Sequence, residues 1–138
     1  GEIKRIMGID RKHTIIIVGA GNIGHALTNF PGFAETGFEV KALFDVNEDL
    51  IGTEIKGHPV LDVKDMDEYI RENQIDIGVI AARRSAAQEI ADRMCAAGIR
   101  GIWNFVPLDI TTSVPIENVH LSESLSTLSY KIEHGLLD

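Results

Sequence analysis

The sequence predicts an α/β fold with a doubly wound, mostly parallel sheet, because strand-like and helix-like segments alternate along it. The clearest strand is 14–18, an unbroken run of β-branched side chains that suits a strand buried on both faces. A glycine-rich turn follows this strand directly, and a short helix is predicted at 22–30, before a Pro-Gly stop. The alternation continues to residue 105, so we expect helices on both faces of the sheet.

Apolar spacing and stop signals predict the remaining elements. Further strands are expected at 38–44, at 59–61, at 75–81, within 99–105 and at 119–121. Helices are expected at 65–72, 85–97 and 124–134. Ser85 is expected to cap the second of these helices, with Gln88 three residues on, and Gly98 to end it. Residues 1–8 resemble the last turns of a helix that stops at Gly8, which fits either the trailing part of a longer protein or a trimmed terminus.

Composition and charge are ordinary for one soluble globular domain, with 44% hydrophobic and 25% charged residues in a chain of 138. No apolar stretch approaches the roughly 18 residues that span a bilayer, and no signal peptide is visible, so we expect a cytoplasmic protein without a membrane partner. The single cysteine, Cys95, fits a reducing compartment and is expected to be packed or partly packed. The histidines show no metal-ligand spacing, and the net charge of −8 argues against direct binding of nucleic acid.

The glycine turn carries the first functional signal, because Gly19, Gly21 and Gly24 have G-x-G-x-x-G spacing. This spacing provides a tight turn, a close backbone approach and close packing of helix on strand. Between a buried strand and a helix it is typical of a Rossmann-type fold that holds a dinucleotide pyrophosphate at the helix N-terminus. The residues expected to contact the cofactor here are Gly19, Ala20, Gly21, Asn22, Ile23 and Gly24.

Asp45 supplies the second signal, because it ends the second predicted strand about 20 residues after Gly24. An acidic residue at this distance hydrogen-bonds the adenosine ribose in dinucleotide-binding proteins, and its charge repels a 2′-phosphate. Val46 and Asn47 follow, so no arginine is placed to pair with such a phosphate, and the pattern favours NADH and NAD over their phosphorylated forms. The alternative is that Asp45 only starts a turn with Asn47.

Residues after the fourth and fifth strands are expected to line the nicotinamide half of the same crevice, since carboxyl ends of strands face the ligand in such folds. These residues are Ala81, Ala82, Arg83, Asn104 and Phe105, with Val46 on the adenosine side. The alternatives are that Arg83 and Arg84 are solvated charges and that Phe105 is a core aromatic. For His25, in the first turn of the helix, a phosphate contact and a solvated side chain are both open.

Catalytic signals are missing from the sequence. No Ser-His-Asp or Cys-His constellation has a recognisable local motif, and no second domain is large enough to hold a substrate over a nicotinamide. These features favour a sensor over an enzyme, and no residue is assigned a catalytic role.

Ordered motifs along nearly the whole chain resemble those of Rex, the NADH-sensing transcriptional repressors of bacteria. The motifs are VGAGNIGHAL at 18–27, NFPGF at 29–33, FDV at 44–46, AAQ at 86–88, AGIRGI at 97–102, NFVP at 104–107, VP at 114–115, ENVHL at 117–121 and LSTLSY at 125–130. Two departures from the family concern the coupling to DNA binding. His120 stands where the family usually has Asp, and the family's Val-Pro is missing near Ala82 and Arg83.

The resemblance implies a domain plan. Residues 1–12 would be the tail of a connector from an N-terminal winged-helix domain that this chain lacks, 13–122 the NAD(H)-binding Rossmann domain, and 123–138 a domain-swapped helix. Leu125, Leu128 and Ile132 would pack on the partner subunit of a homodimer. NADH binding would close the dimer and release DNA, which only the winged helix contacts.

Two other functions remain open at this stage. One is a small NAD-dependent oxidoreductase domain detached from its substrate domain. The other is a CoA- or nucleotide-binding Rossmann domain without a redox role.

Overall fold

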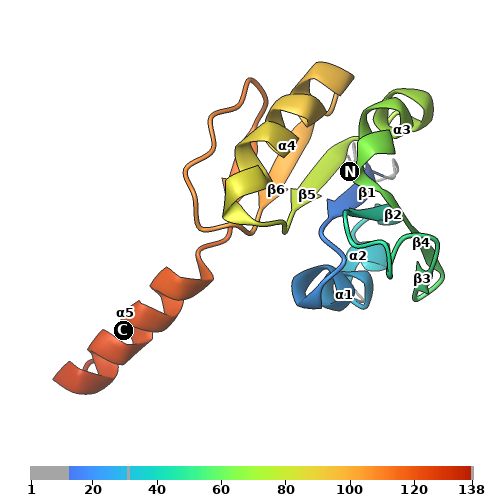
Figure 1. The fold of residues 1–138 in the computed structure, drawn as a ribbon. Helices are drawn as coiled ribbons and strands as arrows, with labels where there is room; N and C mark the ends of the chain where they lie inside the picture. Colours follow the sequence, from blue (N-terminus) through green and yellow to red (C-terminus); the bar gives the residue numbers. More distant parts are fainter. Residues whose placement is uncertain (1–12, 31, 138) are drawn as a thin grey trace, which may run out of the picture.

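The computed structural model describes residues 13–30 and 32–137, which form a seven-stranded sheet in the order β3-β4-β2-β1-β5-β6-β7 (Figure 1). The strands are β1 (His13–Val18), β2 (Phe38–Asp45), β3 (Glu54–Ile55), β4 (His58–Asp62), β5 (Ile77–Ile80), β6 (Gly101–Asn104) and β7 (Ile116–Asn118). Every pairing between neighbours is parallel except the short hairpin of β3 and β4. The predicted fold class is therefore confirmed, and the strand order reverses direction between β1 and β5.

Helices cover the sheet from both sides (Figure 1). They are α1 (Asn22–Thr28), α2 (Gly32–Glu35), the 3-10 turn η2 (Val63–Asp65), α3 (Met66–Asn73), α4 (Arg84–Ala97) and α5 (Leu121–His134). Along β1, Ile15 and Ile17 join the core that includes Phe33 of α2, whereas Ile16 joins the core under α3 and α4. The unbroken apolar run of β1 therefore reflects burial on both faces.

Several predicted boundaries are corrected by the structure. The strand expected at 119–121 is wrong, because β7 ends at Asn118 and α5 begins at Leu121. The Ser85 cap is also wrong, because α4 begins at Arg84, after Arg83 in an extended conformation, and no side chain caps it. Gly98 ends α4 at a φ of 102°, as predicted.

The sequence does not predict the short elements β3, α2 and η2, and the helical turns expected at 1–8 lie outside the described residues. The antiparallel edge strand β3 is two residues long, and α2 is four residues long. Elements this short leave too few residues for a hydrophobic period to show.

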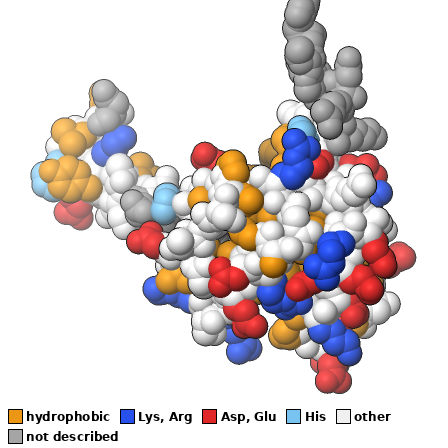
Figure 2. Space-filling view, turned by 90° about the horizontal axis from the view of Figure 1, so that it is seen from above, with side chains coloured by type: hydrophobic (Ala, Val, Ile, Leu, Met, Phe, Trp, Pro, Cys, Tyr) orange, Lys and Arg blue, Asp and Glu red, His pale blue; other side chains and the backbone are white. Residues whose placement is uncertain are grey.

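The last helix, α5, projects away from the rest of the molecule (Figure 1). Leu125, Leu128 and Ile132 are 69%, 53% and 71% exposed on it. Figure 2 shows hydrophobic side chains at the surface of this projecting helix, at the left of the view. None of the helices among the described residues is long and apolar enough to cross a membrane.

At the amino ends of the strands, Asp76 fastens β1 to the segments before β5 and β6. Its carboxylate accepts from the Thr14 N–H at 3.1 Å and from the Arg100 guanidinium at 3.2 Å, and His13 lies 3.5 Å away. Burial alone would raise the pKa of Asp76, but the Thr14 hydrogen bond and the Arg100 charge hold the pKa below its ordinary value of 3.8.

We predict that Asp76→Ala lowers the free energy of unfolding by about 1–3 kcal/mol near neutral pH, because it leaves the Thr14 N–H without its acceptor. A carboxyl whose pKa is lowered by folding stabilises the protein above its unfolded pKa, and this contribution is lost as pH falls through the folded pKa. The stability difference between the wild type and the variant should therefore shrink below about pH 3.8.

Urea denaturation at a series of pH values measures this difference. Asp109→Ala, which removes an exposed carboxylate, is the matched control. A difference that stays constant into strong acid would contradict the role assigned to the Asp76 carboxylate.

Candidate functional site

The carboxyl ends of β2, β1, β5, β6 and β7 form one continuous edge. Beyond each of four strands, a backbone N–H donates to a carbonyl near the end of the neighbouring strand. These bonds are Gly19 to Phe44 at 2.7 Å, Ala81 to Val18 at 2.8 Å, Phe105 to Ile80 at 2.9 Å and Val119 to Asn104 at 2.8 Å. The loops that leave this edge are thereby held side by side, at the point where the strand order reverses. Crevices at such points bind ligands in open α/β sheets.

The glycine turn joins β1 to α1, and two of its glycines are required by the chain itself. Gly19 has a φ of +113°, and a Cβ there would lie 2.4 Å from the Ala81 carbonyl oxygen. A Cβ at Gly24 would lie 2.0 Å from the Gly19 carbonyl oxygen. No side chain fits at either position without moving backbone.

Gly21 differs, because a Cβ there would meet nothing within 4 Å. Its φ of −81° also lies outside the left-handed region that favours glycine. The fold therefore does not require glycine at this position. The missing side chain leaves open space beside the turn, next to the first N–H groups of α1, which have no partner within the helix.

Asp45 connects the end of β2 to this turn. One carboxylate oxygen accepts from the Ala20 N–H at 2.8 Å, and the other from the Val46 and Asn47 N–H groups at 2.7 and 2.9 Å. The turn with Asn47 is thus present together with the contact to the glycine turn. A carboxylate offers about four lone-pair positions, so three N–H donors leave capacity for a ribose hydroxyl.

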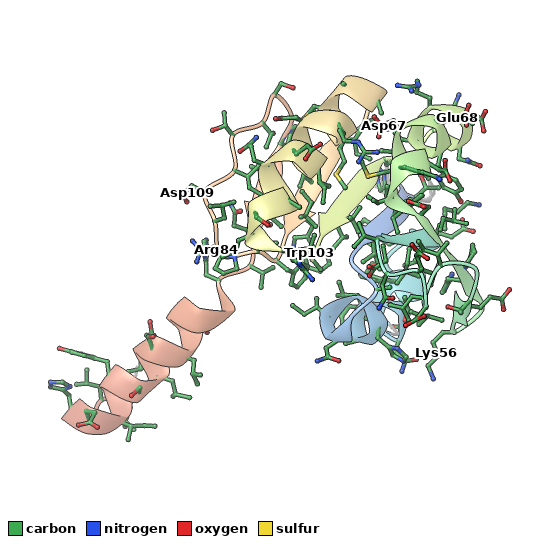
Figure 3. All side chains as sticks on the ribbon, in the orientation of Figure 1. Lys56, Asp67, Glu68, Arg84, Trp103 and Asp109 are labelled. Atoms are coloured by element: carbon green, nitrogen blue, oxygen red, sulfur yellow. The ribbon has the colours of Figure 1, made fainter. Side chains whose placement is uncertain are left out.

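The structure places most of the predicted residues at this one edge. Val46 is 70% exposed directly after Asp45. Ala81 and Ala82 are half-buried after β5, and Arg83 and Arg84 are exposed at the start of α4, where Figure 3 labels Arg84.

Phe105 and His25 complete the edge. Phe105 is half-buried and packs against Trp103, which Figure 3 labels, at a ring distance of 4.7 Å. Both rings pack against the core that does not include α4. His25 is exposed in the first turns of α1. Among the described residues, no group of three His, Cys, Asp or Glu side chains is arranged to hold a metal ion.

Asn104 occupies a different environment, because it is fully buried. Its side-chain N–H₂ donates to the Val106 carbonyl and to the Asn118 side chain, both at 2.9 Å, and its oxygen accepts from the Val106 N–H at 2.9 Å. The amide is therefore engaged within the protein and does not face the crevice. Any contribution of Asn104 to ligand binding would come from the loop that it holds.

Sequence reasoning did not identify the residues that hold the segment after β6. Gln88 of α4 donates to the Thr111 carbonyl at 2.8 Å and accepts from the Thr111 N–H at 3.0 Å. Asn118 accepts from Asn104. The sequence pattern places Gln88 three residues after a predicted cap, and nothing in that pattern connects it with a residue 23 positions away.

We predict that Gly24→Ala lowers the free energy of unfolding by about 1–3 kcal/mol or more, the range for overpacked interiors, because its Cβ would meet the Gly19 carbonyl. Gly21→Ala is the matched control and should change stability by less than about 0.5 kcal/mol, since its Cβ meets open space. Thermal unfolding of both variants measures the difference. Equal destabilisation by the two substitutions would argue against the close approach at Gly24.

A protein-family model described as "CoA binding domain" matches residues 10–108 of this chain. The redox-sensing transcriptional repressor Rex of Clostridioides difficile (strain 630) is 47% identical over 136 residues, which are 97% of this chain and 65% of that protein. The similarity to this Rex repressor therefore extends over almost the whole chain, whereas the match to the family model ends at residue 108, before α5.

Solved structures of RSP, a Rex-family repressor, have the same fold as this chain. The complex of RSP with beta-NADH matches with a TM-score of 0.87 and 43% identity, covering 93% of this chain and 63% of that one. The complex with beta-NAD+ and operator DNA matches with a TM-score of 0.88 at the same identity, covering 93% of this chain and 60% of that one. This chain thus spans less than two thirds of the length of the relatives that it matches.

Proposed function

We propose that this chain, which belongs to the CoA-binding domain family, is the NAD(H)-binding, redox-sensing part of a Rex-type transcriptional repressor. The observation that carries the proposal is the open space at Gly21, beside a turn whose other two glycines are closed against backbone. The sequence identity of 41–47% between this chain and Rex repressors supports the same function.

In this proposal the glycine turn holds the dinucleotide pyrophosphate. The backbone of Gly19, Ala20 and Gly21 would approach it closely, and the first N–H groups of α1, at Asn22, Ile23 and Gly24, would donate to its oxygens. The positive end of the helix dipole favours negative charge at this position.

Asp45 would bind the adenosine ribose through the lone pairs that its backbone donors leave free, with Val46 beside the adenine. The nicotinamide half would lie along Ala81, Ala82, Arg83 and Phe105. The buried Asn104 side chain holds the backbone of Val106, directly after Phe105.

The same carboxylate favours NAD(H) over CoA. The adenosine of CoA carries a 3′-phosphate, and a negative group at the ribose would repel it. RSP is described in complex with beta-NADH and with beta-NAD+, which agrees with this choice. We therefore propose NADH and NAD as the ligands, and CoA as the alternative that the family name raises.

The proposed readout is a change of assembly without chemical turnover. The relatives are described as transcriptional repressors, which agrees with the expectation that the chain is not an enzyme. NADH would shift the equilibrium between two dimer arrangements, and this requires different NADH affinities for the two. Residues 1–12 would connect 13–122 to a winged-helix domain that contacts DNA, in the cytoplasm.

The proposed homodimer forms through residues 123–138. Leu125, Leu128 and Ile132 recur at helical spacing and are all exposed, so α5 presents an apolar stripe, and the exposed Leu136 follows just beyond the end of the helix. Covering a Leu or Ile side chain contributes about 1.5–3 kcal/mol. We propose that α5 is swapped onto the partner subunit, which would cover this stripe.

Calorimetric titration with NADH, NAD+ and CoA tests the proposed function. We expect NADH to bind at least about tenfold more tightly than NAD+, a difference of about 1.4 kcal/mol, and CoA to bind weakly or not at all. Gly21→Ala should fold normally and lose most of the NADH affinity, because its Cβ fills the space proposed for the pyrophosphate. Binding of CoA alone would overturn the proposal, as would turnover of NADH with a carbonyl substrate.

Asp45→Ala should weaken NADH binding by about 1–3 kcal/mol, as expected for the loss of a charged hydrogen bond. Because Asp45 also organises its own loop, the discriminating measurement is the ratio of NADH to NADPH affinity. Removing the charge should bring this ratio closer to one, whereas a purely structural defect would weaken both ligands alike. An unchanged ratio would remove Asp45 from the ribose site.

Truncation after Ser122 should convert the dimer to a monomer, as measured by sedimentation velocity. Ile132→Lys should weaken the dimer within the intact helix, because it places a charge on the apolar stripe. Ser126→Lys adds the same charge at an exposed position off the stripe and should leave the dimer unchanged. A dimer that survives the truncation would exclude α5 as its interface.

A further inference from the structure

We infer that the Asn104–Asn118 pair is a positioning device that links the cofactor edge of the sheet to the start of α5. The inference rests on the proposed function and deepens it, because it names the residues through which bound NAD(H) would act on the helix. Asn104 is the one buried polar residue among those that the structure describes, and it lies between the two segments that must communicate.

Asn104 contacts both segments at once. On one side its amide holds the loop that follows β6, through the Val106 N–H and carbonyl. On the other side its N–H₂ donates to Asn118, the last residue of β7, and its backbone carbonyl accepts from the Val119 N–H. Val119 is followed directly by His120, the N-cap residue of α5.

The loop side of this junction begins at the proposed nicotinamide site. Phe105 directly follows Asn104, bonds through its N–H to Ile80 of β5, and packs against Trp103. A ligand that displaces Phe105 would therefore also displace the fully buried side-chain amide of Asn104. Burial strengthens the two bonds to Val106, because breaking either of them leaves a desolvated polar group unpaired, whereas the bond to Asn118 is part-buried.

Other routes by which a shift at Phe105 could reach α5 are restrained. The far part of the loop is fastened to α4 by the paired hydrogen bonds between Gln88 and Thr111, so it cannot absorb a displacement freely. The strand β7 is only three residues long, and Asn118 is its last residue before the chain turns into α5. A shift at Phe105 therefore reaches α5 most directly through Asn104 and Asn118.

Asn118 allows a clean test because it is exposed and lies outside the proposed contacts with the dinucleotide. Asn118→Ala removes the acceptor for the Asn104 N–H₂. Asn118→Asp keeps an acceptor oxygen in the same place and is the conservative variant. Both are studied in the intact 138-residue chain, with NADH and NAD+ affinities measured by calorimetry.

The diagnostic readout is hydrogen–deuterium exchange of the amides at 119–124, which include the Val119 N–H and the Ser124 N–H that bonds the His120 carbonyl. In the wild type we expect the exchange rates of these amides to differ by about tenfold between the NADH and NAD+ complexes. Asn118→Ala should abolish this ligand-dependent difference while NADH affinity stays within about twofold. Asn118→Asp should restore the difference.

The outcomes separate this inference from the function on which it rests. A wild-type chain that fails to bind NADH overturns both. Normal NADH binding with the same exchange rates in the two wild-type complexes overturns the inference alone, since nothing then reaches α5. A ligand-dependent difference that persists in Asn118→Ala overturns it as well. A merely structural role for Asn118 would change exchange equally with both ligands and would leave the difference in place.

Discussion

The arrangement of this molecule depends on two contacts between backbone atoms that no side chain could allow. Gly19 lies against the Ala81 carbonyl, and Gly24 lies against the Gly19 carbonyl. The first contact brings the loop after β1 to the end of β5, and the second places α1 on its strand. With the Asp45 bond to Ala20, they bring the ends of β2, β1 and β5 to a single edge. The proposed pyrophosphate and ribose contacts both begin at this edge.

Much of the fold could be predicted from the sequence, because its core elements have strong local signals. The apolar run of β1, the spacing of Met66 and Ile70 in α3, and Gly98 after α4 each identify their element without knowledge of the rest of the chain. The start of α4 and the position of β7 could not be predicted. The position of β7 depends on contacts with a distant segment, such as the bond from Val119 to Asn104, whereas α4 begins one residue before its predicted start without a side-chain cap.

The candidate site shows the same division. The glycine spacing and Asp45 could be predicted because both follow a familiar local geometry. The role of Asn104 could not, because an asparagine after a strand suits a crevice as well as a buried loop. Only the packed fold shows that its amide is hydrogen-bonded to Val106 and Asn118. A polar residue in a short motif therefore indicated the carboxyl edge of the sheet but not the burial of its own side chain.

The hydrogen bonds of Asp45 limit how the ligand preference of this chain could be altered. One carboxylate holds the glycine turn through Ala20 and folds its own loop through Val46 and Asn47. In the proposed function it also recognises the ribose. A single substitution that admitted a phosphorylated ribose would also release the loop on which the dinucleotide rests. A relative with a different nucleotide preference should therefore differ over the whole segment from the end of β2 to Asn47, with a new set of side chains closing the turn.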